Sequence, residues 1–404
     1  MRKVVITGIG IVSPIGADKS AFWESLAVGR SGIGPITKVD TAELRFKNAA
    51  EVKGFDASSH FDERQMMMLD PFAHFGIVAA REAITDAGFA ADEKFGSRVG
   101  IVTGSCLGGK ETEDAFFYDL YANKKNRVPP IAIPRSMSNS VASHVSMEFG
   151  VTGATFTTST ACSSANHAIG QAFWLIRQGT LDAAIAGGSE APLCYGNLKA
   201  WEAMRVVSPD TCRPFSSDRN GMILGEGGAM LMLETEESAL KRGTKIYAEV
   251  AGFGMSADAH HLTMPLAEGA ARAMQNALDD ARLSPAEVGY INAHGTATQA
   301  NDVMESNAIR LVFGDHTDSI AVSSTKSMHG HTLGAAGALE AAATVLGLHN
   351  ELLPPTANFT ELDPECSLDV IAGEAREASP DAALSNSFAF GGLNAVLAFR
   401  RYTG

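Results

Sequence analysis

A cysteine followed by small polar residues stands where a predicted strand gives way to a predicted helix. Cys162 lies in the segment TACSS at 160–164, after the β-branched run 154–158 and at the start of a helical stretch at 162–178. The dipole and free backbone N–H groups of a helix start favour a thiolate and hold an oxyanion on a thioester carbonyl. A small buried thiol is the other interpretation, since cysteine is among the most buried residue types. The segment alone does not decide between them.

Histidines follow two other predicted strands. His294 leaves the strand 290–292 in the segment NAHGTAT, and His329 and His331 follow the strand 320–323 in the segment KSMHGH. Active residues of α/β sheets gather at strand ends. A cysteine at a helix start and histidines at two strand ends together predict a thiol–imidazole enzyme. No carboxylate or cysteine stands near the two neighbouring histidines at a familiar ligand spacing, so we predict no metal.

The segment NSFAFGG at 386–392 lies between the last two predicted strands. Adjacent glycines allow a backbone to approach a substrate closely. The two phenylalanines are candidates for the gate of an apolar channel, and ordinary core aromatics are the alternative. Neither this segment nor the glycine-rich segment at 104–109 has the spacing of a phosphate-binding or dinucleotide-binding loop.

Short apolar runs alternate with longer helical stretches, which predicts an α/β protein with buried sheets. We expect strands at 4–9, 99–103, 154–158, 183–186, 229–234, 247–253, 290–292, 320–323, 383–386 and 395–400, and helices at 71–87, 162–178, 267–281, 303–312 and 334–348. The stretches 154–172 and 319–343 share one order: a strand, Ser-Thr, a reactive residue and a small-residue helix. This weak internal similarity suggests a duplicated unit, with the charged stretch 235–245 as the connection between its halves.

Composition excludes several classes of protein. The chain has 404 residues, 45% of them hydrophobic, and a net charge of −14, which argues against nucleic-acid binding. Its apolar runs are too short to span a membrane. Five cysteines without a Cys-x-x-Cys pair fit a reducing, cytoplasmic location.

Taken together, these segments resemble the β-ketoacyl-[acyl-carrier-protein] synthases, the thiolase-like condensing enzymes of synthase I and II type. The resemblance covers the whole chain and rests on TACSS (160–164), HGTAT (294–298), KSMHGH (326–331), LGAAG (333–337) and NSFAFGG (386–392). The opening VVITGIG, together with RPF (213–215), DR (218–219) and GEG (225–227), also agrees. The family implies an α/β, thiolase-like fold of two similar α/β halves in stacked α-β-α-β-α layers, here residues 1–245 and 246–404.

The resemblance also implies a reaction and its residues. Cys162 takes an acyl group as a thioester, and His294 and His331 polarise malonyl-acyl carrier protein, whose decarboxylation gives the enolate for a Claisen condensation. The family further implies an oxyanion hole and gate from Cys162, Phe388, Phe390 and Gly391, and a support set of Lys326, Glu340, Asp302, Thr296 and Thr298. An acyl pocket at Leu107 and Cys106 and carrier-protein docking at Arg64 and Arg205 complete the implied set.

No cofactor is implied, and the expected partners are acyl carrier protein and a second copy of the chain. A heterodimer with a ketosynthase-like partner stays open. A non-catalytic chain-length partner is the alternative function, but such proteins lack the nucleophilic cysteine; a thiolase has different motifs. The chain departs from the family at Ala389, Leu393, His329, Ala297 and the stretch 299–301, which leaves the pathway, fatty-acid or specialised polyketide elongation, open.

Overall fold

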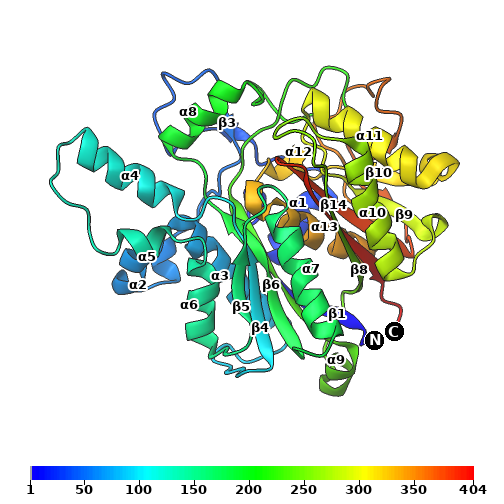
Figure 1. Cartoon of the computed structure of the whole chain (residues 1–404), viewed down its shortest axis with the longest axis horizontal. Helices are drawn as coiled ribbons and strands as arrows, with labels where there is room; N and C mark the ends of the chain where they lie inside the picture. Colours follow the sequence, from blue (N-terminus) through cyan, green and yellow to red (C-terminus); the bar gives the residue numbers. More distant parts are fainter. Residues whose placement is uncertain (1) are drawn as a thin grey trace.

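The computed structural model describes residues 2–404 (Figure 1). Its first part contains β1 Val4–Val12, α1 Lys19–Ala27, β2 Gly34–Pro35, β3 Asn48–Ala49, α2 Glu63–Met68, α3 Pro71–Asp86, β4 Val99–Gly104, α4 Lys110–Tyr121, α5 Ala132–Ser136, α6 Ser140–Phe149, β5 Thr155–Thr158, α7 Ser164–Arg177, β6 Ala183–Glu190, α8 Tyr195–Met204 and β7 Gly227–Thr235. The rest contains α9 Glu236–Arg242, β8 Ala248–Ala257, α10 Ala267–Ala281, β9 Val288–Asn292, α11 Gln299–Phe313, β10 Ala321–Ser323, α12 Lys326–His329, α13 Ala336–Asn350, β11 Leu352–Leu353, β12 Asp369–Val370, β13 Arg376–Glu377, β14 Ala382–Ala389 and β15 Leu393–Arg401.

The strands form two sets with the same order and the same directions. The first set runs β5-β4-β6-β7-β1, and the second runs β10-β9-β14-β15-β8. In both sets the first three strands are parallel to one another and the last three are antiparallel. A short pairing of Val4–Ile6 in β1 with 248–250 in β8 joins the sets into one continuous sheet, with β12 at its far edge. This structural repeat explains the internal similarity between the stretches 154–172 and 319–343 of the sequence.

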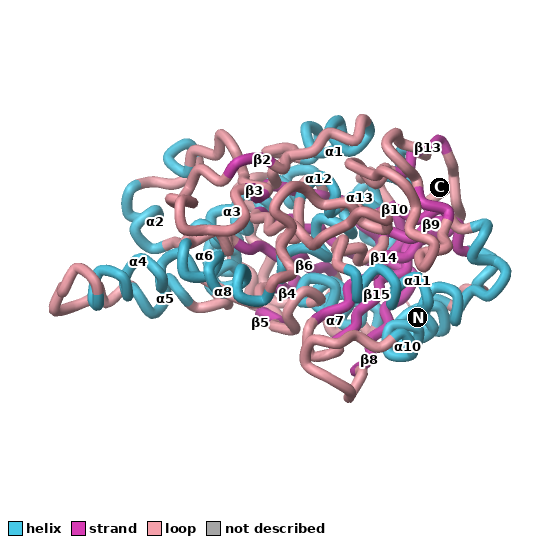
Figure 2. Tube along the Cα trace, turned by 90° about the horizontal axis from the view of Figure 1, so that it is seen from above, coloured by secondary structure: helices cyan, strands magenta, loops and turns pink. Residues whose placement is uncertain are grey.

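Helices separate and cover the two strand sets. The helices α7 and α13 contact strands of both sets and each other, so they form the middle layer. The helices α3 and α6 pack on the outer side of the first set, and α10 with α11 lies outside the second. Figure 2 shows the same molecule from above, with the α4–α5 hairpin projecting from one end. The predicted α/β, thiolase-like architecture with α-β-α-β-α layers is confirmed.

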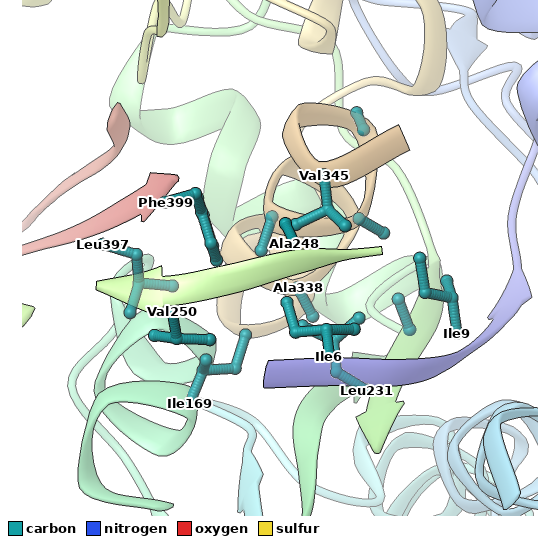
Figure 3. Packing of buried hydrophobic residues seen from close by; sticks show 14 of the residues in the cluster. Ile6, Ile9, Ile169, Leu231, Ala248, Val250, Ala338, Val345, Leu397 and Phe399 are labelled. Carbon is teal, nitrogen blue, oxygen red and sulfur yellow. The ribbon is translucent and has the colours of Figure 1, made fainter. Parts of the chain in front are cut away.

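The core lies where the middle helices meet both strand sets. Ile6 and Leu231 from the first set, Phe399 from the second, Ile169 from α7 and Val345 from α13 are all buried together (Figure 3). Burying each such side chain contributes about 1.5–3 kcal/mol to the stability of the fold.

Small residues are required where the middle helices cross. A Cβ at Gly337 of α13 would come within 2.4 Å of the side-chain oxygen of Asn166 in α7. The amide of Asn166 in turn donates to the carbonyls of Ser385 and Ala395 in the second strand set. The Ala/Gly-rich composition of α13 therefore reflects its place between two sheets.

Most predicted elements are present, and several boundaries differ. The predicted helix 267–281 is α10 itself, whereas the helix expected at 162–178 begins only at Ser164. The helix expected at 334–348 begins with a 3-10 turn at Leu333–Ala335 before α13. The charged stretch 235–245 contains the short helix α9. Among the helices of residues 2–404, none combines the length and apolar character needed to cross a bilayer.

Candidate active site

Cys162 lies in the turn between β5 and α7, just ahead of the first helical residue. Ala161 has a φ of 49°, in the left-handed region that non-glycine residues rarely adopt. The Ser164 hydroxyl closes the turn, since it accepts the Thr160 N–H (2.9 Å) and donates to the Ala161 carbonyl (2.7 Å). This tight turn aims a buried cysteine, 7% exposed, away from the helix that follows.

His294 follows β9, and a buried carboxylate of α11 fixes its backbone. Glu305 accepts the N–H groups of His294 and Gly295, each at 2.8 Å. A Cβ at Gly295 would come within 2.5 Å of the side chain of Ser324, so the turn needs glycine there. Sequence reasoning missed Glu305. The available signal was its place one helical turn after Asp302, which puts both acids on one face of α11.

His331 follows α12, and backbone groups orient its ring. The backbone N–H of His331 donates to the Ile223 carbonyl at 2.6 Å, and the ring Nδ1 accepts the Leu333 N–H at 3.2 Å. Because Nδ1 is an acceptor, the proton of the neutral ring is on Nε2. The same holds for His294, whose Nδ1 lies 3.2 Å from the Nζ of Lys326, a donor. Both rings therefore carry their proton on Nε2, because Nδ1 accepts from Lys326 in His294 and from Leu333 in His331.

The structure brings Cys162, His294 and His331 together. The cysteine Sγ and one nitrogen of each ring all lie within 4.8 Å of one another. The two rings are nearly perpendicular, with centroids 5.3 Å apart. Three buried side chains from three separate junctions thus surround one small space.

The cysteine sulfur and the two ring nitrogens also have the spacing of a Cys-His-His metal site. To bind a metal at Nε2, either ring would have to move its proton to Nδ1, where it would face the Leu333 N–H or the Lys326 ammonium. The arrangement therefore suits hydrogen-bond donation rather than metal ligation. His329 is turned elsewhere: its Nδ1 lies 2.9 Å from the Gly330 carbonyl, and its Nε2 lies 3.0 Å from the Thr325 hydroxyl.

Burial sets the protonation states of the cluster. It raises the pKa of the Cys162 thiol to about 11, and Lys326 and the backbone N–H groups of Phe390 and Cys162 only partly oppose this. The helix start favours a thiolate, but burial favours the neutral thiol, because lost hydration disfavours the charged sulfur. Burial and the nearby Lys326 ammonium lower the pKa of His294 and of His331 well below the usual range. At neutral pH the site holds a thiol and two neutral imidazoles.

Lys326 links His294 to a second buried carboxylate. Its ammonium forms an ion pair with Glu340 of α13, and both side chains are fully buried. Burial raises the pKa of the Glu340 carboxyl, while the Lys326 ammonium opposes the increase. The pair keeps a donor against the Nδ1 of His294 and so fixes that ring's tautomer.

A cavity of about 650 Å³ opens onto the cluster. Polar and apolar side chains share its wall, which includes Thr296, Thr298, Gln299, Asn220, Trp201, Met222, Phe388 and Phe390. Exposed apolar side chains from the segment 261–265 also line it, with Leu262 at 72% and Met264 at 58% exposure. Sequence reasoning missed this segment and its His261, which lie outside every motif singled out above.

The gate segment is held against two neighbours. The ring of Phe390 stacks on Trp201 of α8, with centroids 6.1 Å apart and an angle of 25°. The Gly391 N–H donates to the Leu262 carbonyl at 2.7 Å, and both Gly391 and Gly392 have positive φ values of 85° and 67°. These contacts place a flexible glycine pair between an aromatic stack and the exposed 261–265 segment.

The predicted acyl-pocket residues lie behind the cavity wall. Neither Leu107 nor Cys106 is among the residues that line the cavity. Both pack into an apolar cluster with Trp201 and Met222, which do line it. Burial raises the pKa of the Cys106 thiol well above its usual value, and the nearby carboxylate of Glu190 adds to this.

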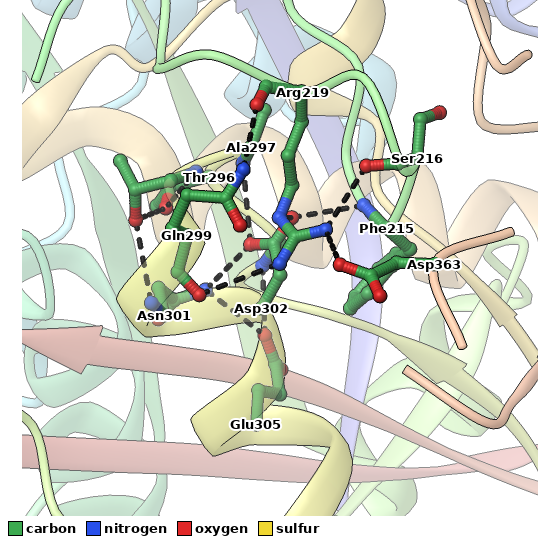
Figure 4. A network of polar contacts seen from close by, with 12 residues as sticks. Phe215, Ser216, Arg219, Thr296, Ala297, Gln299, Asn301, Asp302, Glu305 and Asp363 are labelled. Carbon is green, nitrogen blue, oxygen red and sulfur yellow. Dashed lines mark hydrogen bonds and ion pairs between the residues drawn. The ribbon is translucent and has the colours of Figure 1, made fainter. Parts of the chain in front are cut away.

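Asp302 joins the histidine turn to the segment that carries the RPF and DR motifs (Figure 4). Its two oxygens accept the N–H groups of Phe215 (2.8 Å) and Ala297 (3.2 Å). Arg219 lies 3.6 Å from Asp302 and also pairs with Asp363, which sequence reasoning missed. The network fixes the turn whose hydroxyls, on Thr296 and Thr298, lie 2.9 Å apart in the cavity wall.

The two predicted docking arginines lie on the surface. Arg205 ends α8 with a φ of 58° and lines the cavity. Arg64 is exposed on α2 and does not line the cavity.

Comparisons with known proteins agree with this geometry. The family model of the β-ketoacyl synthase N-terminal domain matches residues 1–239, and that of the β-ketoacyl synthase C-terminal domain matches residues 247–360. The chain belongs to the β-ketoacyl synthase family. The resemblance seen in the motifs is thereby confirmed, and the chain is an acyltransferase of the kind that carries out condensation in fatty-acid or polyketide elongation.

Relatives of this β-ketoacyl synthase align over nearly its whole length. Nodulation protein E of Rhizobium sp. (strain N33) is 48% identical over 400 residues, which cover 99% of each chain. The 3-oxoacyl-[acyl-carrier-protein] synthase 2 of Synechocystis sp. is 42% identical over 99% of this chain and 98% of the relative.

Solved structures share the fold of this synthase. The ishigamide ketosynthase/chain length factor superposes with a TM-score of 0.95, at 37% identity over 99% of both chains. The AntDE ketosynthase, solved with its type II polyketide acyl-carrier protein AntF, has a TM-score of 0.89 at 31% identity, over 99% of this chain and 100% of the other.

Proposed function

We propose that this synthase holds an acyl group as a thioester on Cys162 and condenses it with malonyl-acyl carrier protein, releasing carbon dioxide and 3-oxoacyl-acyl carrier protein. The observation that carries the proposal is the buried cluster in which one thiol and two neutral imidazoles lie within 4.8 Å. The thiol must lose its proton to act as a nucleophile, whereas the imidazoles must keep theirs to donate a hydrogen bond. The thiol and the rings therefore suit different half-reactions.

In the first half-reaction the sulfur of Cys162 attacks the carbonyl of an acyl thioester. The new carbon–sulfur bond replaces the bond to the carrier thiol, and the proton of Cys162 leaves with that thiol. The backbone N–H groups of Cys162 and Phe390, which face the sulfur, are placed to hold the oxyanion. Acyl transfer therefore depends mainly on this turn and on the gate segment that carries Phe390.

In the second half-reaction the Nε2–H groups of His294 and His331 donate to the thioester carbonyl oxygen of the malonyl group. The bond to its carboxylate breaks, carbon dioxide leaves, and the electron pair becomes the enolate. The enolate carbon attacks the acyl carbonyl on Cys162, and the sulfur leaves and regains a proton. The lowered pKa of both histidines keeps them as neutral donors throughout.

Acyl carrier protein is the proposed partner, and Arg205 beside the cavity is its proposed contact, with Arg64 as a second. The relative AntDE binds its carrier protein AntF, which supports this choice. We also propose a homodimer, because β5 is an edge strand and its Phe156 is 37% exposed. The heterodimer with a ketosynthase-like partner is the other outcome, whereas Cys162 argues against a non-catalytic chain-length role.

Two further proposals concern the boundary between the halves of the chain and its cellular location. Residues 1–245 and 246–404 are the proposed halves, since the first strand set ends with β7 and the second begins with β8. Five free cysteines support a reducing cytoplasm as the location.

Intact mass spectrometry after incubation with a panel of acyl-carrier proteins tests the function. The expected result is an acyl adduct on Cys162 that disappears, with formation of 3-oxoacyl product, when malonyl-carrier protein is added. An adduct on another residue, or a stable adduct with no product from any member of the panel, would contradict it.

A further inference from the structure

Glu190, the last residue of β6, is a buried carboxylate that the reaction does not use. It is 0% exposed, and no lysine, arginine or histidine among residues 2–404 forms an ion pair with it. A charge in such a place is costly unless hydrogen bonds replace its hydration. Its four hydrogen-bond donors come from two segments that are far apart in the sequence.

The first segment is the loop after β4. One carboxylate oxygen of Glu190 accepts the Ser105 hydroxyl (2.9 Å) and the Leu107 N–H (3.2 Å), and the other accepts the Cys106 N–H (2.8 Å). The Ser105 oxygen also accepts the Gly108 N–H at 3.0 Å, so its proton is free for the carboxylate. This loop packs against the apolar cluster that backs the cavity wall.

The second segment follows His331, which lies just after α12. The Gly334 N–H donates to Glu190 at 3.2 Å, and the neighbouring Leu333 N–H donates to the Nδ1 of His331. A Cβ at Gly334 would come within 2.4 Å of the Glu190 carboxylate and 2.5 Å of the Cys106 nitrogen. Glycine is needed there because the two segments meet directly across the carboxylate.

We propose that Glu190 is a positioning residue that couples the acyl-pocket loop 105–107 to the segment that orients His331. This rests on the proposed function of the site. One carboxylate fixes three amides and a hydroxyl, so a shift of the loop by an acyl chain is transmitted through Glu190 to the Leu333 N–H and the His331 ring. Glu190 thus acts on both half-reactions without contacting either substrate.

Three variants separate the contact of Glu190 with the loop 105–107 from its contact with Gly334. Glu190→Gln keeps the shape but turns an acceptor oxygen into a donor that faces N–H groups. Ser105→Ala removes one donor on the loop side and leaves the Gly334 bond in place. Glu234→Gln is the control: Glu234 is equally buried in the neighbouring strand β7, but it accepts the Thr7 hydroxyl, forms an ion pair with Arg242 and lies beside Ala183, at the end of β6 opposite Glu190.

The experiment measures acyl-Cys162 formation against acyl length, and decarboxylation of malonyl-carrier protein by the acylated enzyme. Glu190→Gln is expected to change the length profile and to slow decarboxylation on the order of tenfold to a hundredfold, the effect of a small misplacement of a catalytic group. Ser105→Ala is expected to change only the length profile, and Glu234→Gln neither. A folded Glu190→Gln enzyme with both properties unchanged would overturn the proposal, as would an unchanged profile in Ser105→Ala.

Hydrogen exchange provides a readout that does not depend on the reaction. In Glu190→Gln the amides of 105–108 and of 331–335 are expected to lose protection together, whereas protection in Glu234→Gln stays as in the wild type. Loss in one segment only would contradict the coupling. If the wild type itself formed no acyl adduct, the proposed function would fail, and the exchange data would still decide the coupling.

Discussion

Two of the three strand-to-helix junctions that carry the chemistry, the one with Cys162 and the one with His331, occupy equivalent places in the repeated fold but are built differently. After β5 the chain makes one tight turn and enters α7, which places Cys162 at the turn. After β10 it makes the short helix α12 and a 3-10 turn before α13, and this extra backbone carries Lys326 and His331. A nucleophile needs only a sharp turn, whereas a ring that must donate from one chosen nitrogen needs a separate partner for the other.

The largest expected effect comes from breaking the first junction. Cys162→Ala is expected to abolish acyl transfer, a loss of at least about a thousandfold, because no other group supplies the nucleophile. The fold is expected to survive, since the change removes a single sulfur atom. Intact mass spectrometry and thermal unfolding measure both effects. Cys194→Ala is the control, and a normal 3-oxoacyl product from Cys162→Ala would refute the assignment.

Removing either histidine, His331 of the second junction or His294 of the junction between β9 and α11, is expected to affect the other half-reaction. His294→Ala or His331→Ala removes one of two donors to the developing enolate and is expected to slow decarboxylation about a hundredfold to a thousandfold. Acyl-Cys162 formation is expected to continue, because it depends on the turn and the backbone amides. A variant that fails to acylate but still decarboxylates malonyl-carrier protein would reverse the roles of the two junctions.

The pH dependence sharpens the same contrast. Because burial raises the pKa of Cys162 to about 11, alkylation of the thiol by iodoacetamide is expected to rise about tenfold per pH unit between about pH 6 and 9. The lowered pKa of the two histidines keeps decarboxylation by the acylated enzyme nearly flat over that range. A plateau in alkylation near pH 7 would show that the thiolate is stabilised after all.

The local order of the sequence was enough to select the three residues of the cluster. Cys162 and His294 closely follow β5 and β9, His331 follows β10 and the short helix α12, and the structure brings the three side chains together. The protonation state of Cys162 could not be predicted from the local sequence, because it depends on burial by segments far away in the sequence. Glu305 and Glu190 were missed for a related reason: several of their partners are backbone N–H groups, which leave no mark in a motif.

The acyl pocket tests a prediction that the structure leaves open. Leu107 lies behind the cavity wall, in one apolar cluster with Trp201 and Met222. Leu107→Ala is expected to admit longer acyl chains, with each further buried methylene adding about 0.8 kcal/mol until space ends, and Leu107→Trp to restrict the enzyme to short ones. The rate of acyl-Cys162 formation against chain length measures this. An unchanged profile in both variants would assign length control to the gate at Phe390 or to a dimer partner.

The smallest effect is expected at His329, which belongs to the second junction but points away from the reaction. Its Nδ1 donates to the Gly330 carbonyl and its Nε2 accepts the Thr325 hydroxyl, so it fixes the turn just before His331. The family usually has threonine here. His329→Thr is therefore expected to cost about 1–3 kcal/mol of folding free energy and to slow decarboxylation less than tenfold.

The pH dependence of stability tests whether the ring stays neutral in the folded state. Burial lowers the pKa of His329 to about 3, so below about pH 6.5 the unfolded state binds a proton that the folded state does not. Its contribution to stability is complete above that pH and falls as the solution becomes more acidic, by at most about 1.4 kcal/mol per pH unit. Urea unfolding at pH 7.5 and at pH 5 is thus expected to show a smaller difference between wild type and His329→Thr in acid. An equal difference at both values would mean that the folded protein does not lower the pKa of this ring, and that His329 is protonated as readily in the folded as in the unfolded state.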